Sequence, residues 1–202
     1  MSCSVWKSSR RKSSRREGVL RAERQARGAA IDVAGLFFPE FGARVGEEGD
    51  GNVKAPDEIQ QEFIDGFVAA GDTFEQFDYL LQLSAQLEEL PEERKVKEVL
   101  VEGCQSQVWL YPSWEGASSG EGFALEGDSD TLMVRGVIYL FQQMFSGQDA
   151  RAIIECPVRF VEETELVYIF DAKRQAGVSA IASTIKDFAR KALSNKEEPH
   201  HG

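Results

Sequence analysis

Cys104 is the residue of this chain best placed to do chemistry. It stands in the run Val101-Glu-Gly-Cys-Gln-Ser-Gln-Val-Trp-Leu110, where Gly103 can adopt a positive φ and let a loop turn tightly before a strand. The only two histidines, His200 and His201, lie near the end of the chain, where a frayed terminus positions nothing. An activating Cys-His pair, as in cysteine proteases and acyltransferases, is therefore disfavoured, and we expect the thiol to be activated by a partner.

The surroundings of Cys104 follow from what a reactive sulfur needs. Only the thiolate attacks sulfur, so we predict that flanking backbone amides point at Cys104 and favour the anion. A bound persulfide needs shelter from stray thiols, which predicts a hollow, walled by Val101 and Trp109, and a loop that turns outward for the recipient. The alternative for Trp109 is a plain place in the core of the sheet.

Three stretches of the sequence together resemble the SufE/CsdE family of sulfur acceptors: GCQSQVWL around Cys104, GDSDTLMVRG further on, and Arg174-x-x-Gly177. The resemblance covers residues 56–194. It implies that Cys104 takes persulfide sulfur from a pyridoxal-phosphate-dependent cysteine desulfurase of the SufS/CsdA type, stimulates that enzyme, and passes sulfur to an iron–sulfur scaffold of the SufB type. It implies an accessory carrier rather than a freestanding enzyme, with no cofactor or metal of its own.

The same resemblance assigns a supporting role to Asp130, and Gly103 and Gln105 flank the cysteine as parts of its loop. Asp130 stands where a central helix is expected to begin. It would either cap that helix, for about 1 kcal/mol, with Asp128 or Ser129 as alternative caps, or act on the thiol by receiving its proton or raising its pKa. The sequence leaves both roles open.

Arg174 is the other supporting residue that the resemblance implies. A guanidinium there would stabilise a thiolate or persulfide anion or bridge to an acidic group; the alternative is a solvated arginine before the last helix. The Thr-Pro-Ser that usually leads into the family's arginine is replaced here by Asp171-Ala-Lys173.

The number and spacing of the cysteines also bear on three other functions. An iron–sulfur scaffold of the IscU type needs several converging cysteines, or cysteines with histidine. The cysteines at positions 3, 104 and 156 form no pair at metal spacing and are odd in number for a disulfide framework. They are typical of a reducing compartment, and we expect Cys156 to serve packing. A redox-sensing interaction module is the remaining alternative, and the missing histidine disfavours a thiol hydrolase.

The charge distribution limits the partners. Residues 56–202 carry 12 Lys/Arg and 27 Asp/Glu, a net charge of −15, whereas residues 1–55 carry 11 and 7, a net charge of +4. An acidic body repels phosphate backbones, so nucleic-acid binding is disfavoured. No stretch approaches the 18 or so uncharged apolar residues of a membrane-spanning helix. The sequence leaves open whether the chain forms a homodimer.

The composition divides the chain into three parts. We predict that residues 1–54 are a disordered lead and linker, which is basic at first and then acidic and Gly-rich. Residues 55–195 are predicted to form the folded domain, and residues 196–202 a disordered tail. The Arg- and Ser-rich start resembles an organellar transit peptide, and the alternative is a disordered tail or a start codon assigned too early. We expect a cytoplasmic protein, or a plastid or mitochondrial one if the lead is a transit peptide.

Apolar periodicity predicts an α+β fold, a small antiparallel sheet flanked by several helices. A capping box is expected at Thr73 and Gln76, and the strands are expected at 107–111 and 123–126, with a short third strand before Cys104 and a long mobile loop at 113–121. The expected helices are 57–69, one that begins near Thr73, a central helix from Thr131 to Gly147, 149–155, 159–168 and 176–193.

Overall fold

The computed structural model describes residues 54–114 and 122–197, with side chains to Ser194. The predicted lead before residue 54, residues 115–121 of the expected mobile loop, and the tail from 198 lie outside the described residues. The elements are α2 (Pro56–Ala70), α3 (Thr73–Ser84), the short 3₁₀ helices η2 (Glu92–Arg94) and η3 (Lys97–Val99), β1 (Val108–Trp114), β2 (Phe123–Ser129), α4 (Leu132–Phe145), α5 (Ala150–Glu155), α6 (Leu166–Ile169) and α7 (Ala172–Glu197).

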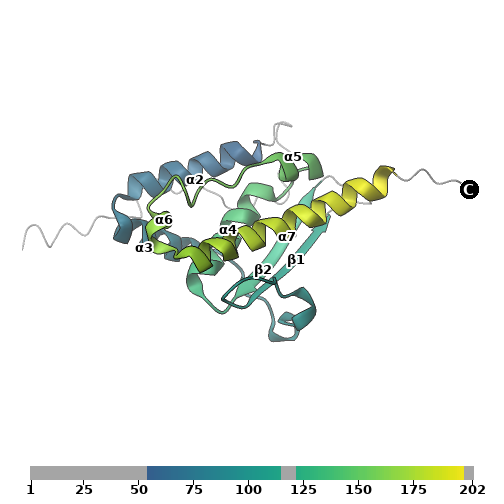
Figure 1. The fold of residues 1–202 in the computed structure, drawn as a ribbon, viewed down its shortest axis with the longest axis horizontal. Helices are drawn as coiled ribbons and strands as arrows, with labels where there is room; N and C mark the ends of the chain where they lie inside the picture. The colour runs from purple at the N-terminus through teal and green to yellow at the C-terminus, as the bar shows by residue number, and fades with distance from the viewer. Residues whose placement is uncertain (1–53, 115–121, 198–202) are drawn as a thin grey trace, which may run out of the picture. The chain divides into compact units, whose positions relative to one another are not determined.

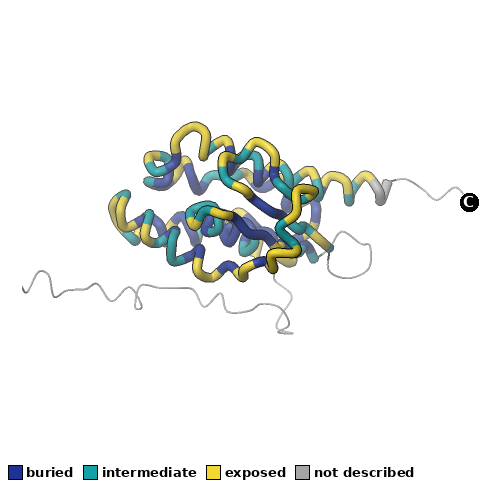
Figure 2. Tube along the Cα trace, turned by 90° about the horizontal axis from the view of Figure 1, so that it is seen from below, coloured by how far each residue is buried: buried dark blue, intermediate teal, exposed yellow. Residues whose placement is uncertain are grey.

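Helix α4 is the central helix, as predicted. Its residues from Gly136 to Phe141 are all buried, and it packs against α2, α3, β2 and α7. Figure 1 shows α7 running across α4 and the two strands, and in Figure 2 the buried stretches gather in the interior between the helices. A Cβ atom at Gly136 would lie 2.6 Å from the Leu80 carbonyl oxygen, so the glycine is what lets α3 and α4 approach so closely.

The sheet confirms the predicted antiparallel pair but is longer than expected. Strands β1 and β2 pair from Val108 opposite Ser129 to Trp114 opposite Phe123. Pro112 lies inside β1, which is tolerated because both strands of a two-stranded sheet are edge strands. The third strand expected before Cys104 is reduced to a single bridge between Leu100 and Trp109.

The start of α3 corrects the predicted capping box by one residue. Asp72 is the N-cap, and the Glu75 carboxylate reaches back to the Asp72 amide. Thr73 instead donates its hydroxyl proton to the Glu165 carboxylate at 2.8 Å. Gln76 is buried, and its side-chain oxygen accepts a hydrogen bond from the Glu165 amide. These two bonds fasten α3 to the segment that leads into α6.

The C-terminal third differs most from expectation. The helix expected at 159–168 is confined to 166–169, because the amides of Glu165 and Leu166 donate to the side chains of Gln76 and Thr164 rather than to the carbonyls of the preceding turn. Helix α7 begins at Ala172 instead of 176, since the Asp171 carboxylate accepts the Arg174 amide at 2.9 Å and serves as its N-terminal cap. The helix runs to 197 rather than 193.

None of the helices in the described part of the chain is long and apolar enough to span a membrane.

Candidate functional site

Cys104 lies in the loop that joins η3 to β1. The amide of Val101 donates to the Val108 carbonyl at 2.9 Å and closes the base of this loop. Gly103 has a φ of 85°, so the predicted left-handed turn is confirmed and favours glycine over residues with a side chain. Cys104 is partly exposed, and Gly103 and Gln105 on either side are exposed. The Cys104 sulfur is therefore carried at the tip of a short turn.

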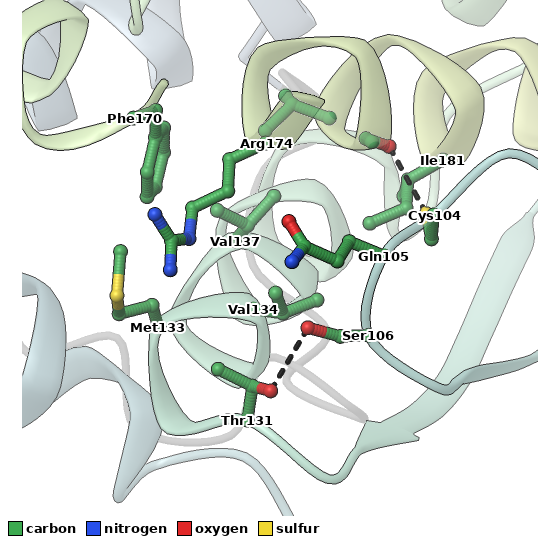
Figure 3. Close-up of a pocket in the computed structure, with 12 residues that line it drawn as sticks. Cys104, Gln105, Ser106, Thr131, Met133, Val134, Val137, Phe170, Arg174 and Ile181 are labelled. Carbon is green, nitrogen blue, oxygen red and sulfur yellow. Dashed lines mark hydrogen bonds between the residues drawn. The ribbon is translucent and has the colours of Figure 1, made fainter. Parts of the chain in front are cut away.

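A small hollow adjoins the Cys104 sulfur. The loop contributes Cys104, Gln105 and Ser106, and the opposite walls come from the start of α4, the start of α7 and Phe170 (Figure 3). Its volume is about 30 Å³, room for roughly two water molecules. The lining residues are Cys104, Gln105, Ser106, Thr131, Met133, Val134, Val137, Phe170, Arg174, Gly177, Val178 and Ile181.

The walls are not the predicted ones. Val101 and Trp109 are both buried but do not line the hollow. Trp109 is paired across the sheet with Asp128 and bridges to Leu100, which is the alternative of a plain place in the sheet core. Neither residue forms a wall, because the loop folds toward α4 and α7 instead.

The sulfur is held as a thiol rather than as a thiolate. The Cys104 Sγ donates to the Gly177 carbonyl of α7 at 3.3 Å, and burial raises the pKa of the Cys104 thiol above its ordinary value. The predicted backbone amides aimed at the sulfur are replaced by a carbonyl acceptor, which favours the protonated form. In this arrangement, loss of the carbonyl or gain of a new partner would favour ionisation of the thiol.

Asp130 holds the loop instead of capping α4. The N-cap of α4 is Thr131, and no side chain caps it, so the predicted cap at Asp130 is wrong. The Asp130 carboxylate accepts the Gln107 amide and the Thr131 hydroxyl, each at 3.1 Å. The Thr131 hydroxyl also lies 2.9 Å from that of Ser106. Asp130 therefore positions the end of the Cys104 loop through these two residues and does not itself line the hollow.

Ser129 also holds the Cys104 loop in place. The sequence indicated it only as an alternative cap of α4. Its hydroxyl donates to the Gln107 carbonyl at 2.7 Å and accepts the Thr131 amide at 3.3 Å. Gln107 is thus held at both its amide and its carbonyl by the junction of β2 and α4. The signal in the sequence was the Gly-Asp-Ser-Asp run itself, which places three polar residues at the end of a strand.

Arg174 shares the hollow with Cys104 but lies inside α7, not before it. Its guanidinium pairs with Asp171 at 3.3 Å, and both side chains are about half exposed. In Figure 3 the guanidinium lies at the Phe170 end of the hollow, and the Gln105 amide lies between it and Cys104. The structure therefore brings Cys104, Gln105 and Arg174 to one cavity and gives the arginine the acidic partner that was one of its predicted roles.

A buried charge cluster behind the site was missed by sequence reasoning. Asp128 is 2% exposed and pairs with Arg135, and also with Lys95 at 3.3 Å. It accepts the Leu90 amide at 3.2 Å and the Ser129 amide at 2.8 Å. Asp128 thus ties the segment between α3 and β1 to the same β2–α4 junction that grips the Cys104 loop.

The site offers no set of ligands for a metal. No group of three or more His, Cys, Asp or Glu side chains at metal-binding distance exists among residues 54–114 and 122–197. Of the two cysteines in these ranges, Cys104 lines the hollow and Cys156 is buried elsewhere, as expected for packing. Chemistry at the hollow therefore rests on one sulfur.

Comparisons with known proteins agree on a family. The family description "Fe-S metabolism associated domain", SufE, matches residues 61–189. An uncharacterized SufE-like protein of Rhizobium etli is 31% identical over 130 residues, 64% of this chain and 88% of that protein. A similarly named protein of Rhizobium meliloti is 34% identical over 92 residues, 46% of this chain and 66% of that protein.

A solved structure shares the fold. The solution structure of a hypothetical protein from Thermus thermophilus matches with a TM-score of 0.56 and 19% identity, covering 70% of this chain and 99% of that one. The α+β architecture predicted from sequence is thus also found in a solved structure.

Proposed function

The chain belongs to the SufE family, whose domain is associated with Fe-S metabolism, and on that premise we propose that it is a sulfur acceptor and carrier with Cys104 as the carrying residue. The observation that supports this most directly is the position of Cys104 against a hollow of about 30 Å³. A space of that size has room for one added sulfur atom, because it admits roughly two water molecules.

The proposed transfer is a thiol–disulfide type exchange. The Cys104 thiolate attacks the terminal sulfur of a persulfide on the desulfurase, forming a new S–S bond while the donor S–S bond breaks. The desulfurase cysteine leaves as a thiolate, so there is no net oxidation or reduction. The thiol proton of Cys104, held on the Gly177 carbonyl in the free protein, must leave first. Relieving the desulfurase of its persulfide accounts for stimulation of that enzyme.

The partners follow from this chemistry. The donor is a pyridoxal-phosphate-dependent cysteine desulfurase of the SufS/CsdA type, which holds the cofactor, and the recipient is an iron–sulfur scaffold of the SufB type. The carrier unit is residues 55–195, which contain the matched range 61–189 and every residue of the site. We place it in the cytoplasm, or in an organelle if residues 1–54 act as a transit peptide.

The decisive experiment is sulfur loading read by intact mass. The full chain is incubated with a desulfurase and cysteine, and peptide mapping locates any added sulfur. We expect one sulfur atom on Cys104, none on the Cys104→Ser variant, and normal loading of Cys156→Ser, the matched control at a buried thiol. Equal loading of Cys104→Ser and wild type would refute the proposal.

Two further measurements separate the alternatives. Anaerobic incubation with iron and sulfide should give no cluster absorbance, whereas a scaffold would acquire it. Peroxide treatment without a desulfurase should leave no stable sulfenic acid on Cys104, whereas a redox sensor would retain it. The raised pKa of the Cys104 thiol disfavours the sensor, because susceptibility to oxidation follows thiolate character.

A further inference from the structure

Gly177 is the residue of α7 against which Cys104 lies. A Cβ atom built at position 177 would lie 3.5 Å from the Cys104 Sγ and 3.8 Å from its Cα, so the loop rests on the helix backbone itself. The carbonyl of the same residue accepts the hydrogen bond of the thiol at 3.3 Å. One residue therefore sets both how close the sulfur comes to α7 and where its proton points.

The next turn of α7 also fits the loop. A Cβ atom at Gly103 would lie 3.7 Å from the Cβ of Ala180, so Ala180 faces the residue that precedes the cysteine. Positions 177 and 180 are three residues apart and share one face of the helix. Larger side chains at either position would fill the space that the loop now occupies.

We propose that Gly177 is a positioning residue that holds the Cys104 sulfur in the hollow, and that the absence there of a side chain longer than methyl determines how accessible the sulfur is in the free protein. The effect of Gly177 on sulfur transfer rests on the proposed function. The position itself is a property of the protein alone. A side chain longer than methyl at 177 displaces the loop, breaks the bond to the Gly177 carbonyl and opens the sulfur to reagents in solution.

The charged groups around the sulfur are few. Among the described residues that line the hollow, Arg174 of α7 is the one charged side chain, and those from α4 are uncharged. On its own loop, the exposed Glu102 is nearby in sequence. Moving the sulfur outward therefore acts chiefly by removing burial, the cause that raises the pKa of the Cys104 thiol, so the pKa falls toward its ordinary value.

The experiment measures alkylation of Cys104 by iodoacetamide in the full chain, read by peptide mass against time and pH. For Gly177→Leu we expect a rate roughly tenfold higher, the scale of one lost neutral hydrogen bond, and a lower pH midpoint. Gly177→Ala should react like wild type, because its methyl makes only ordinary contact with the sulfur, and should melt at a higher temperature, since alanine is the better helix former. The control is Ala176→Leu, at an exposed position of the same helix, with no change in rate.

An unchanged rate and pH midpoint in a folded Gly177→Leu protein would overturn the proposal. If circular dichroism shows that this variant does not fold, Ala180→Leu decides, because it presses on the loop from the next turn: faster alkylation of Cys104 supports the proposal and an unchanged rate overturns it. Failure of wild-type protein to take up sulfur from a desulfurase would count against the proposed function instead, since the alkylation series needs no partner.

Discussion

Removal of the Asp128 carboxylate is expected to destabilise this protein more than removal of any exposed charge. The side chain is 2% exposed and pairs with Arg135 and Lys95. It also accepts the backbone amides of Leu90 and Ser129. The substitution Asp128→Ala leaves these donors without their acceptor while the surrounding elements stay packed.

The magnitude follows from what the partners retain. Arg135 is 15% exposed and keeps only its bond to the Leu87 carbonyl, at 2.7 Å, so its charge is left largely buried and unpaired. Breaking a buried pair in this way costs about 3–5 kcal/mol. This range already includes part of the cost of leaving the buried Leu90 amide without its hydrogen-bond acceptor. We expect a loss of about 4 kcal/mol of unfolding free energy, or roughly 10 °C in melting temperature for a domain of this size.

Urea denaturation followed by tryptophan fluorescence and circular dichroism measures this loss. Asp187→Asn is the matched control, because Asp187 is 57% exposed and pairs with an exposed Arg190, and surface pairs contribute little. In the double variant Asp128→Ala/Arg135→Met the loss should be smaller than the sum of the two single losses, since no buried charge is left unpaired. A loss for Asp128→Ala no larger than that of the control would refute the reasoning.

Three other outcomes are expected. Burial raises the pKa of Cys156 to about 11 from 9.0. Above pH 9.0 the folded protein therefore keeps a thiol proton that the unfolded chain loses. The contribution of this group to the free energy of unfolding is fully present below pH 9.0 and is lost as the pH rises toward 11. Cys156→Ala should therefore flatten the fall in unfolding free energy over that window, and an equally steep fall would contradict this. Gly136→Ala places a methyl 2.6 Å from the Leu80 carbonyl and should lower stability by about 1–3 kcal/mol despite better helix propensity; an unchanged melting temperature would show that α3 and α4 separate easily. Asp130→Asn keeps an oxygen for the Gln107 amide and should load sulfur like wild type, whereas Asp130→Ala should cost about 1 kcal/mol and slow loading; equal defects in both would assign the role to the charge.

The local sequence pattern predicts those helices whose backbone amides are not accepted by side chains from elsewhere in the fold. The 3.6-residue apolar spacing places α2, α4 and α5 within a few residues of their observed bounds. It fails at 159–168 because Gln76, 89 positions earlier in the chain, accepts the Glu165 amide and Thr164 accepts the Leu166 amide, both of which would otherwise continue a helix there. It misplaces the start of α7 because the apolar repeat begins only at Val178, whereas Asp171 caps a first turn that lies before it.

The charge cluster shows a different limit of sequence reasoning. Asp128 stands between a glycine and a serine at the end of a strand, a context typical of an exposed turn or a helix cap. Its partners Leu90 and Arg135 lie 38 positions before and 7 positions after it, and only the packing of the α3–β1 connection over the sheet brings them together. Burial of a carboxylate depends on such distant donors, and no spacing rule reveals them.

The state of Cys104 is the most consequential difference between expectation and structure. Flanking amides were expected to favour a thiolate, yet the group that meets the sulfur is a carbonyl 73 positions away, in α7. A carbonyl accepts a proton-bearing donor and repels an anion, so in the free protein it opposes the reactive form. Under the proposed function, attack on a persulfide needs the thiolate, so the sulfur must first lose the Gly177 carbonyl or gain a new partner. We therefore propose that a docking desulfurase would activate the thiol by drawing the loop off the helix or by supplying that new partner, which would couple reactivity to docking without a histidine.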